Sequence, residues 1–325
     1  MHKNFFARDA LAASAVLAMG VGGACAQSYP SQPIRFIVPY AAGGGVDMVA
    51  RAIAPKLSER LGQPVVIDNR GGAGGNIGTE LAARTEPNGY TIMMGAAALA
   101  INTSLYRNLP FDPVKDFVPV SLVSATPNIL AVHPAVPAKS VKQLIQLAKA
   151  QPGRLNYGSA GNGTTSHLAP ELLKTMAGVD IVHIPYKGTS PAVVALLSGE
   201  VAIMLAPALT LLPHVKTNKV NGLAVSGLKR LPAIPELPTI AESGVPGFEA
   251  RQWYGVLAPA GTPKEIVTRL NSEIVKIVNS PEVTKRFASE GSEAIGSTPE
   301  EFGRYIKAEI TKWAKVVAAS GARVD

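Results

Sequence analysis

Two glycine-containing loops have the composition of a binding site for a small anion. The first, residues 39–47, contains three consecutive glycines and ends at Asp47; the second, residues 157–167, combines glycines with serine and threonine hydroxyls. Each loop lies between an apolar segment and a helical pattern, so its backbone N–H groups lie at the positive end of a helix dipole. We therefore expect both loops to bind an anion. Asp47 could cap its helix or accept from a ligand hydroxyl or amine, and the hydroxyls could also serve only as helix caps.

Three further loops have weaker signals. Residues 185–191 follow an apolar segment and contain Lys187, either a ligand contact or a solvated lysine, and residues 95–98 offer only shape and backbone contacts. Residues 71–78 are rich in glycine but depart from the dinucleotide motif G-x-G-x-x-G, because Ile77 stands where the third glycine is needed. We expect this last loop to have a structural role at the edge of a lobe.

No set of residues indicates catalysis or metal binding. Ser159 lacks the glycine at position 157 that a nucleophile elbow requires. His133, His167, His183 and His214 lack metal-site spacing, and we expect His167 and His183 to be hydrogen-bonded structural histidines. No paired acidic motif suits a general acid and base. The sequence therefore predicts no enzyme, no cofactor and no metal.

The N-terminal residues resemble a secretory signal peptide. Lys3 and Arg8 precede an apolar stretch that ends in Ala24-Cys25-Ala26, so we expect residues 1–26 to be removed. A membrane anchor and a lipoprotein acylated at Cys25 are the alternatives. Cleavage would remove the chain's one cysteine and would leave a net charge one below the +8 of the whole chain. The positive charges are scattered, which argues against nucleic acid as a partner.

Short apolar segments alternate with helical patterns from residue 34 to residue 206. The predicted strands cover residues 34–38, 64–68, 90–95, 128–133, 155–159, 181–185 and 201–206. Helical patterns lie between most of them, for example over residues 46–61, 76–84 and 141–150. This alternation predicts two α/β units with largely parallel sheets.

The last third of the chain is predicted to contain one strand, residues 253–259, followed only by helices. Thr262 and Thr298 are each followed by proline and then by glutamate, which predicts two capped helix starts. We expect the aromatic residues of the second helix to be core residues; these are Phe302, Tyr305 and Trp313.

Helices without new strands must pack on an existing sheet, and the first α/β unit is the natural acceptor. The chain would then leave that unit near Thr126 and return near Glu249, after a proline-rich stretch over residues 228–247. We therefore expect lobe 1 to contain residues 27–125 and 249–325, and lobe 2 residues 126–248. Two crossings between the lobes make a hinge, which would allow them to close on a ligand.

Taken together, the motifs resemble those of the Bug (Bordetella uptake gene) receptors, the periplasmic substrate-binding components of tripartite tricarboxylate transporters. The resemblance extends over nearly all of the mature chain, in order and spacing. Among the motifs that carry it are GGGVD at 43–47, GAGGNIG at 72–78, PNGYT at 87–91, HIPYKG at 183–188, WYG at 253–255 and APAGTP at 258–263.

The resemblance implies a type II periplasmic-binding-protein fold, with two α/β lobes and a ligand carboxylate held mainly by backbone amides, hydroxyls and water. This chain departs from the family pattern at residues 205–208, where relatives often carry Asp or Asn, so we expect an organic or aromatic acid rather than an amino acid. The candidate ligand-binding residues are Tyr40, Gly43, Gly44, Asp47 and Ala97 in lobe 1, and Ser159, Asn162, Thr164, Thr165, Tyr186, Lys187 and Gly188 in lobe 2.

The expected function is that of a monomeric periplasmic receptor that binds a small carboxylate and delivers it to a membrane permease. A sensor that reports to a signalling protein is the first alternative, because the sequence does not separate sensing from transport. A hydrolase or transferase that uses Ser159 in the same cleft is the second.

Overall fold

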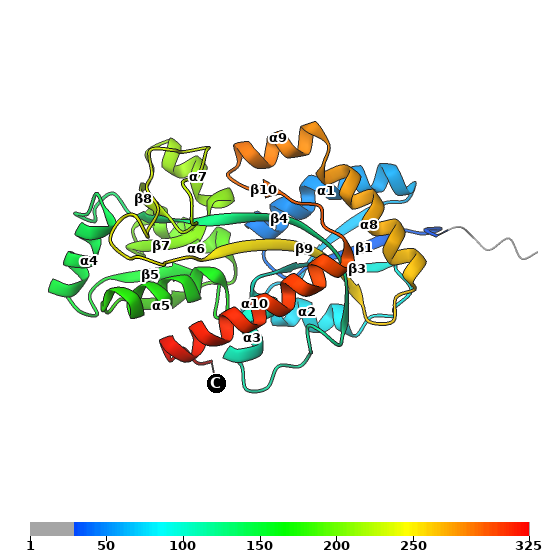
Figure 1. Cartoon of the computed structure of the whole chain (residues 1–325), viewed down its shortest axis with the longest axis horizontal. Coiled ribbons are helices and arrows are strands. Elements are labelled where there is room, and N and C mark those ends of the chain that lie inside the picture. The colour runs from blue at the N-terminus through cyan, green and yellow to red at the C-terminus, as the bar shows by residue number, and fades with distance from the viewer. Residues whose placement is uncertain (1–28, 325) are drawn as a thin grey trace, which may run out of the picture.

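The computed structural model describes residues 29–324, and the predicted signal peptide, with Cys25, lies outside these residues. Within the described range, no helix is both long enough and apolar enough to cross a membrane. The molecule is elongated and consists of two α/β lobes that lie side by side along its long axis (Figure 1). The predicted fold class is confirmed. In lobe 1, the strands predicted over residues 34–38, 64–68 and 90–95 lie within one residue of their observed positions, and the strand predicted from residue 253 begins two residues earlier, at Arg251.

All strands belong to one continuous network of hydrogen-bonded neighbours. Their order is β2 (Val65–Asn69), β1 (Ile34–Val38), β3 (Thr91–Ala96), β9 (Arg251–Pro259), β4 (Phe117–Val132), β7 (Ile203–Pro207), β5 (Asn156–Ser159) and β6 (Val182–Pro185). The strands β8 (Asn221–Val225) and β10 (Glu293–Ala294) pair with β4 outside this path. In each lobe the strands that lead into the cleft run parallel: β1, β2 and β3 in one and β5, β6 and β7 in the other.

Strand β4 connects the lobes without a break. Its first part, Phe117 to Pro127, pairs with β9, and its last part, Asn128 to Val132, pairs with β7 and β8. The sequence predicted only the second part, over residues 128–133. The first part includes Pro119, Ser121 and Ser124, which interrupt the apolar pattern although the segment is largely buried.

The two chain crossings are joined by hydrogen bonds. The N–H group of Asn128 donates to Ser226 Oγ at 2.8 Å, and its side-chain amide donates to the Ala250 carbonyl at 3.1 Å. The Ser226 hydroxyl in turn donates to that same carbonyl. Residues 228–247 form the irregular return expected from their prolines, with one isolated bridge at Thr239.

Ten α-helices and one short 3-10 helix are described over residues 29–324. They are α1 (Gly45–Leu61), η1 (Ala73–Gly75), α2 (Asn76–Ala83), α3 (Ala98–Leu105), α4 (Val141–Ala150), α5 (Thr165–Ala177), α6 (Thr189–Ser198), α7 (Ala208–Lys216), α8 (Lys264–Val278), α9 (Pro281–Ser289) and α10 (Pro299–Ser320).

One predicted helix cap is wrong and the other is confirmed. The helix α8 begins at Lys264 without a side-chain cap, because the Thr262 hydroxyl donates to the Pro259 carbonyl at 2.7 Å instead. Thr298 does cap α10, and Glu301 completes the reciprocal pair of a capping box. The strand β10 was not predicted, since a two-residue strand leaves no periodic pattern.

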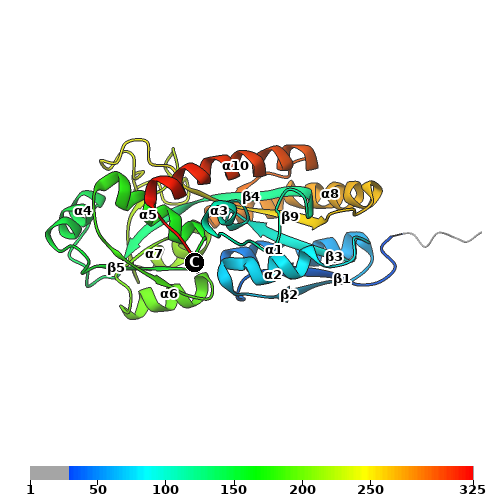
Figure 2. The same ribbon diagram turned by 90° about the horizontal axis from the view of Figure 1, so that it is seen from below.

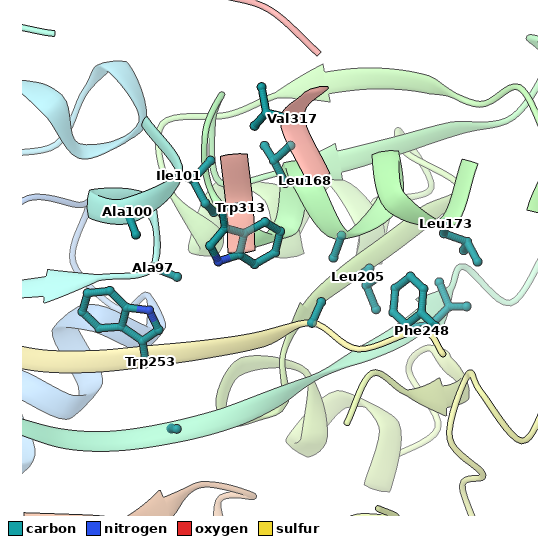
Figure 3. Packing of buried hydrophobic residues seen from close by; sticks show 14 of the residues in the cluster. Ala97, Ala100, Ile101, Leu168, Leu173, Leu205, Phe248, Trp253, Trp313 and Val317 are labelled. Carbon is teal, nitrogen blue, oxygen red and sulfur yellow. The ribbon is translucent and has the colours of Figure 1, made fainter. Parts of the chain in front are cut away.

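The helix α10 crosses from lobe 1 onto lobe 2, where it packs against α5 (Figure 2). Trp313 lies between Ile101 of α3 and Leu168 of α5 and is fully buried, as is Phe302 (Figure 3). Both indole N–H groups, of Trp253 and Trp313, donate to Glu309 Oε2, at 3.2 and 2.9 Å. The predicted core role of Phe302 and Trp313 is confirmed, and Tyr305 is half-buried against the same cluster.

Candidate functional site

Five helices begin around one small cavity between the lobes. Its lining includes the first residues of α1 and α3 from lobe 1, the first residues of α5 and α6 from lobe 2, and Pro207, which precedes α7. The cavity volume is about 20 Å³, enough for one small polar group. Each helix directly follows a strand, so the carboxyl ends of strands from both lobes meet there.

None of these five helices has a side-chain cap. No side chain of the residue that precedes each helix accepts from a backbone N–H group of the first turn; these residues are Gly44, Ala97, Thr164, Gly188 and Pro207. The Thr164 hydroxyl bonds instead to the Gly161 carbonyl at 2.7 Å and to the Ser166 hydroxyl at 3.0 Å. The first N–H groups of a helix have no partner within it, so uncapped starts keep donors available to a ligand. Convergent uncapped helix starts attract negative charge and reject positive charge.

The side chains that line the inner cavity are neutral. Thr165 Oγ1 donates to Gln252 Oε1 at 3.3 Å, across the boundary between α5 and β9. The hydroxyl of Tyr254 is buried beside Gly45 and has no hydrogen-bond partner among residues 29–324. The cavity is therefore rich in donors and contains no carboxylate side chain.

Asp47 is buried and does not line the inner cavity. Its carboxylate accepts from the Gly43 N–H group at 2.8 Å, from Arg51 Nε at 2.8 Å and from Asn69 Nδ2 at 2.9 Å. These partners lower the pKa of Asp47 despite its burial, which by itself would raise it. Asp47 thus fixes the conformation of the glycine loop, where Gly43 has a φ of 78°.

A larger outer cavity of about 190 Å³ adjoins the inner one, and Tyr40 and Ala160 line both. Tyr40 donates to the Gly74 carbonyl at 2.9 Å, and Tyr186 donates to Glu200 at 2.7 Å. Tyr106, Asn162 and the exposed Lys187 complete the polar groups of the wall. This cavity has room for the body of a small molecule whose acidic group lies in the inner cavity.

The two lobes touch around both cavities. Ser190 on α6 donates to the Ala42 carbonyl at 3.1 Å. Gly74 of lobe 1 lies so close to the Asn162 carbonyl that a Cβ atom there would overlap it, and Gly163 of lobe 2 has the same relation to Asn102. The structure is therefore a closed arrangement that depends on glycine at the points of contact.

The candidate residues fall into two groups in the structure. Six of them line a cavity: Tyr40, Gly44, Asn162, Thr164, Thr165 and Tyr186, with Lys187 at the rim as a seventh. The others line neither cavity: Asp47, Ala97 and Ser159 are buried, and Gly43 and Gly188 lie where the lobes meet, next to Ser190 and Ala41.

Ser159 is fully buried, and its hydroxyl is engaged. Its Oγ accepts from the Gly161 N–H group at 3.1 Å and lies 2.6 Å from His183 Nε2. A serine–histidine contact of this length occurs in hydrolases, but a nucleophile needs an exposed Oγ. The structural role expected for His167 and His183 is confirmed by their hydrogen bonds.

Several lining residues were not singled out from the sequence. Gln252, Ala98, Ser166 and Thr189 line the inner cavity. The glycine loop over residues 72–75, expected only at a lobe edge, lines the outer cavity together with Tyr106. Its signal was present in the sequence, because a run of closely spaced glycines indicates a backbone that other groups approach closely. No grouping of histidine, cysteine or acidic residues within residues 29–324 has the arrangement of a metal site.

Comparison with known proteins gives consistent matches over nearly the whole chain. The family described as tripartite tricarboxylate transporter family receptor matches residues 49–322. BugT of Bordetella pertussis is 39% identical over 301 residues, which cover 92% of this chain and 92% of BugT.

Solved structures are also similar. A protein of R. palustris, solved with adipate, has a TM-score of 0.88 and 40% identity, and the match covers 90% of this chain and 98% of that one. MatC from Rhodopseudomonas palustris, with bound malate, has a TM-score of 0.86 and 31% identity over 89% of this chain and 100% of that one.

Proposed function

The chain belongs to the tripartite tricarboxylate transporter receptor family, and from this premise we propose that it is a periplasmic receptor that closes two lobes around a small organic carboxylate. The observation that carries the proposal is the convergence of five uncapped helix starts from both lobes on one cavity without acidic side chains. Only the closed form brings donors from both lobes to the ligand, so binding stabilises closure.

The ligand's carboxylate would lie in the inner cavity and its body in the outer one. Tyr40, Gly44, Thr164 and Thr165 would contact the acidic group, and Asn162, Tyr186 and Lys187 the remainder. Gly43, Asp47, Ala97, Ser159 and Gly188 would hold these contacts in place. The lobe ranges 27–125 with 249–325, and 126–248, are part of the proposal, with α10 as an additional contact between the lobes.

The lining favours a plain organic acid over an amino acid. An ammonium group needs a carboxylate or carbonyl partner, and the lining of the inner cavity has Pro207 at the position where an acidic residue would help. The known structures with adipate and malate concern relatives, but they make these two acids the first ligands to test.

A thermal-shift screen of the mature protein, from Gln27, tests carboxylate binding. The panel contains adipate, malate, tricarboxylates, aromatic acids and amino acids, with the diamide of adipate as a matched uncharged control. A ligand at about 100 times its dissociation constant stabilises the protein by roughly 2.7 kcal/mol, so at least one acid should raise the melting temperature. The proposal would be contradicted if adipate and its diamide raised the melting temperature equally, or if no acid in the panel raised it.

Delivery to a membrane permease is the second part of the proposal. It predicts that the acid identified in the screen enters cells only when receptor and permease are both present. Uptake of the radiolabelled acid by cells with and without the receptor measures this. Capture of a signalling protein by the closed receptor, with uptake unchanged, would instead favour the sensor.

A further inference from the structure

Two stacked histidines lie directly behind the loop that carries Gly161 to Thr164. The rings of His167 and His183 are 4.1 Å apart at an interplanar angle of 13°, and that of His183 also stacks on Tyr157 at 4.9 Å. His167 is buried on the first turn of α5, and His183 is half-buried on β6. Neither ring lines a cavity, so neither would touch the proposed ligand.

Both rings hold N–H groups of this loop. Gly163 N–H donates to His167 Nδ1 at 3.2 Å. Gly161 N–H donates to Ser159 Oγ at 3.1 Å, and this oxygen also forms a hydrogen bond of 2.6 Å with His183 Nε2. The glycines adopt φ values of 119° and 79°, so these bonds fix an unusual backbone conformation. The loop continues into Thr164 and Thr165, which line the inner cavity.

The hydrogen bond from the Gly163 N–H group requires a neutral His167 imidazole, whereas His183 Nε2 accepts from or donates to Ser159 Oγ according to its tautomer. A neutral ring offers one nitrogen as an acceptor, whereas a protonated ring has only donors. Protonation of His167 at Nδ1 would direct an N–H group at the Gly163 N–H group. Protonation of both rings would place two like charges about 4 Å apart, where they repel each other.

The surroundings of the rings also favour the neutral form. The ionisable groups that face them are Tyr157 of β5 and, on α5, Glu171 and Lys174; Tyr157 donates to Glu171 at 2.7 Å, and so does Lys174 at 3.0 Å. The neighbouring elements α10 and β7 contribute apolar residues such as Trp313 and Leu205. Burial, aided by Lys174, lowers the pKa of His167 to about 4. Burial and His167 lower the pKa of His183 to about 3, against the opposing effect of Glu171.

We infer that His167 and His183 are positioning residues for the anion-binding loop, and that the loop keeps its binding conformation only while His167 is neutral. The inference rests on the proposed function, since it assigns this loop to the ligand. It adds a control by acidity, because protonation of His167 would break its hydrogen bond with Gly163 and so weaken the binding of the anion.

The direction of the pH effect follows from proton linkage. Both pKa values are lower in the closed loop than in an opened one, so the opened loop binds more protons between about pH 6.5 and pH 4. The closed loop is fully stable above about pH 6.5 and loses stability as the pH falls. For His167 alone, values of 6.5 when open and about 4 when closed predict about 30-fold more opening near pH 5 than near pH 7.5.

Hydrogen–deuterium exchange of the ligand-free mature protein tests the inference. After correction for intrinsic rates, the protection of residues 160–167 should fall about 30-fold between pH 7.5 and pH 5, as the linkage requires. Residues 42–49, the corresponding loop of lobe 1, serve as the internal control and should change little. Equal changes in the two loops would overturn the inference, and this comparison needs no variant.

The double variant His167→Asn and His183→Gln tests whether titration of the two rings causes the pH response of the loop. Each amide retains an acceptor near the nitrogen it replaces and stays neutral at every pH. The variant should keep its loop protection near pH 5. His214→Gln is the matched control, because burial also lowers the pKa of His214 but this residue lies on α7 and has no contact with the loop. A double variant with the same pH response as the wild type would overturn the inference.

These measurements contain no ligand, so their failure is distinct from failure of the proposed function. If the loop opens in acid but no acid in the thermal-shift panel binds, the positioning role stands and carboxylate capture fails. If adipate or malate binds but the loop is insensitive to pH, carboxylate capture stands and the positioning role of the histidines fails.

Discussion

Helix starts in the cleft differ from helix starts on the outside of the molecule. Around the inner cavity, α1, α3, α5, α6 and α7 begin without a side-chain cap. Away from it, α4, α9 and α10 begin with Ser140, Ser280 and Thr298, whose hydroxyls accept from the first turn at 3.2, 3.4 and 3.2 Å.

This difference indicates that the outer helix starts contribute to the stability of the fold, whereas those in the cleft contribute to ligand binding. A capped helix start satisfies its own donors and adds about 1 kcal/mol of stability. An uncapped start in a cleft leaves its donors for a ligand, which then contributes the missing stabilisation when it binds. The helix α8 also begins without a side-chain cap, but its first residues do not line the inner cavity. The lack of a single cap therefore does not distinguish the cleft, whereas the convergence of five uncapped starts does.

The largest expected effect on ligand affinity comes from a substitution that prevents the lobes from closing. In Gly163→Ala, a Cβ atom would overlap Asn102 of the other lobe, on top of the cost of a φ of 79°. Overpacking of this kind costs about 1–3 kcal/mol, so the affinity for the acid found in the screen should fall roughly tenfold to 100-fold. Isothermal titration calorimetry measures it.

The matched control is Gly178→Ala, at the end of α5. Gly178 has a similar φ of 62° but no neighbour within 4 Å of the added Cβ. It should lose stability and keep its affinity. If both variants bind equally well, contact between the lobes at Gly163 does not limit closure.

An intermediate effect is expected from removing one donor in the cleft. Thr165→Val keeps the shape of the side chain and removes the hydroxyl from the inner cavity. A hydrogen bond contributes about 1 kcal/mol net, so affinity should fall about fivefold; the free energy of unfolding should also fall by about 1 kcal/mol, because Thr165 Oγ1 donates to the buried Gln252 Oε1. Calorimetry and urea unfolding on the same sample separate the two; a loss of stability with unchanged affinity would place Thr165 outside the site.

The smallest effect is expected on the outside. Thr298→Ala removes the cap of α10 and should lower the free energy of unfolding by about 1 kcal/mol, without a change in ligand affinity. Urea unfolding measures the first and calorimetry the second. Weakened binding in this variant would mean that α10, which contacts both lobes, takes part in closure.

Much of the fold was predictable from the sequence because its signals are local. Alternating apolar segments identified β1 and β3, and proline with glutamate after Thr298 identified the start of α10. The start of α8 was misplaced, because Pro263 precedes the helix directly and the Thr262 hydroxyl donates to the Pro259 carbonyl. The first part of β4 was missed because Pro119, Ser121 and Ser124 interrupt its apolar pattern.

The candidate site divides in the same way. Its glycine loops could be recognised because glycines after an apolar strand and before a helix are a pattern within one short segment. Three other features could not be recognised from the sequence. They are the direction of Asp47 into lobe 1, the entry of Gln252 into the cleft and the stacking of His183 on His167.

By itself, the sequence determined the α/β class, the two lobes and the loops that end their strands. These follow from residue periodicity and backbone preferences within about ten neighbouring residues. Only the tertiary structure decided which loops face each other and which buried groups support them. The register of β5 and β6, which sets Tyr157 beside His183, depends on the packing of segments far apart in the chain, and no local pattern records it.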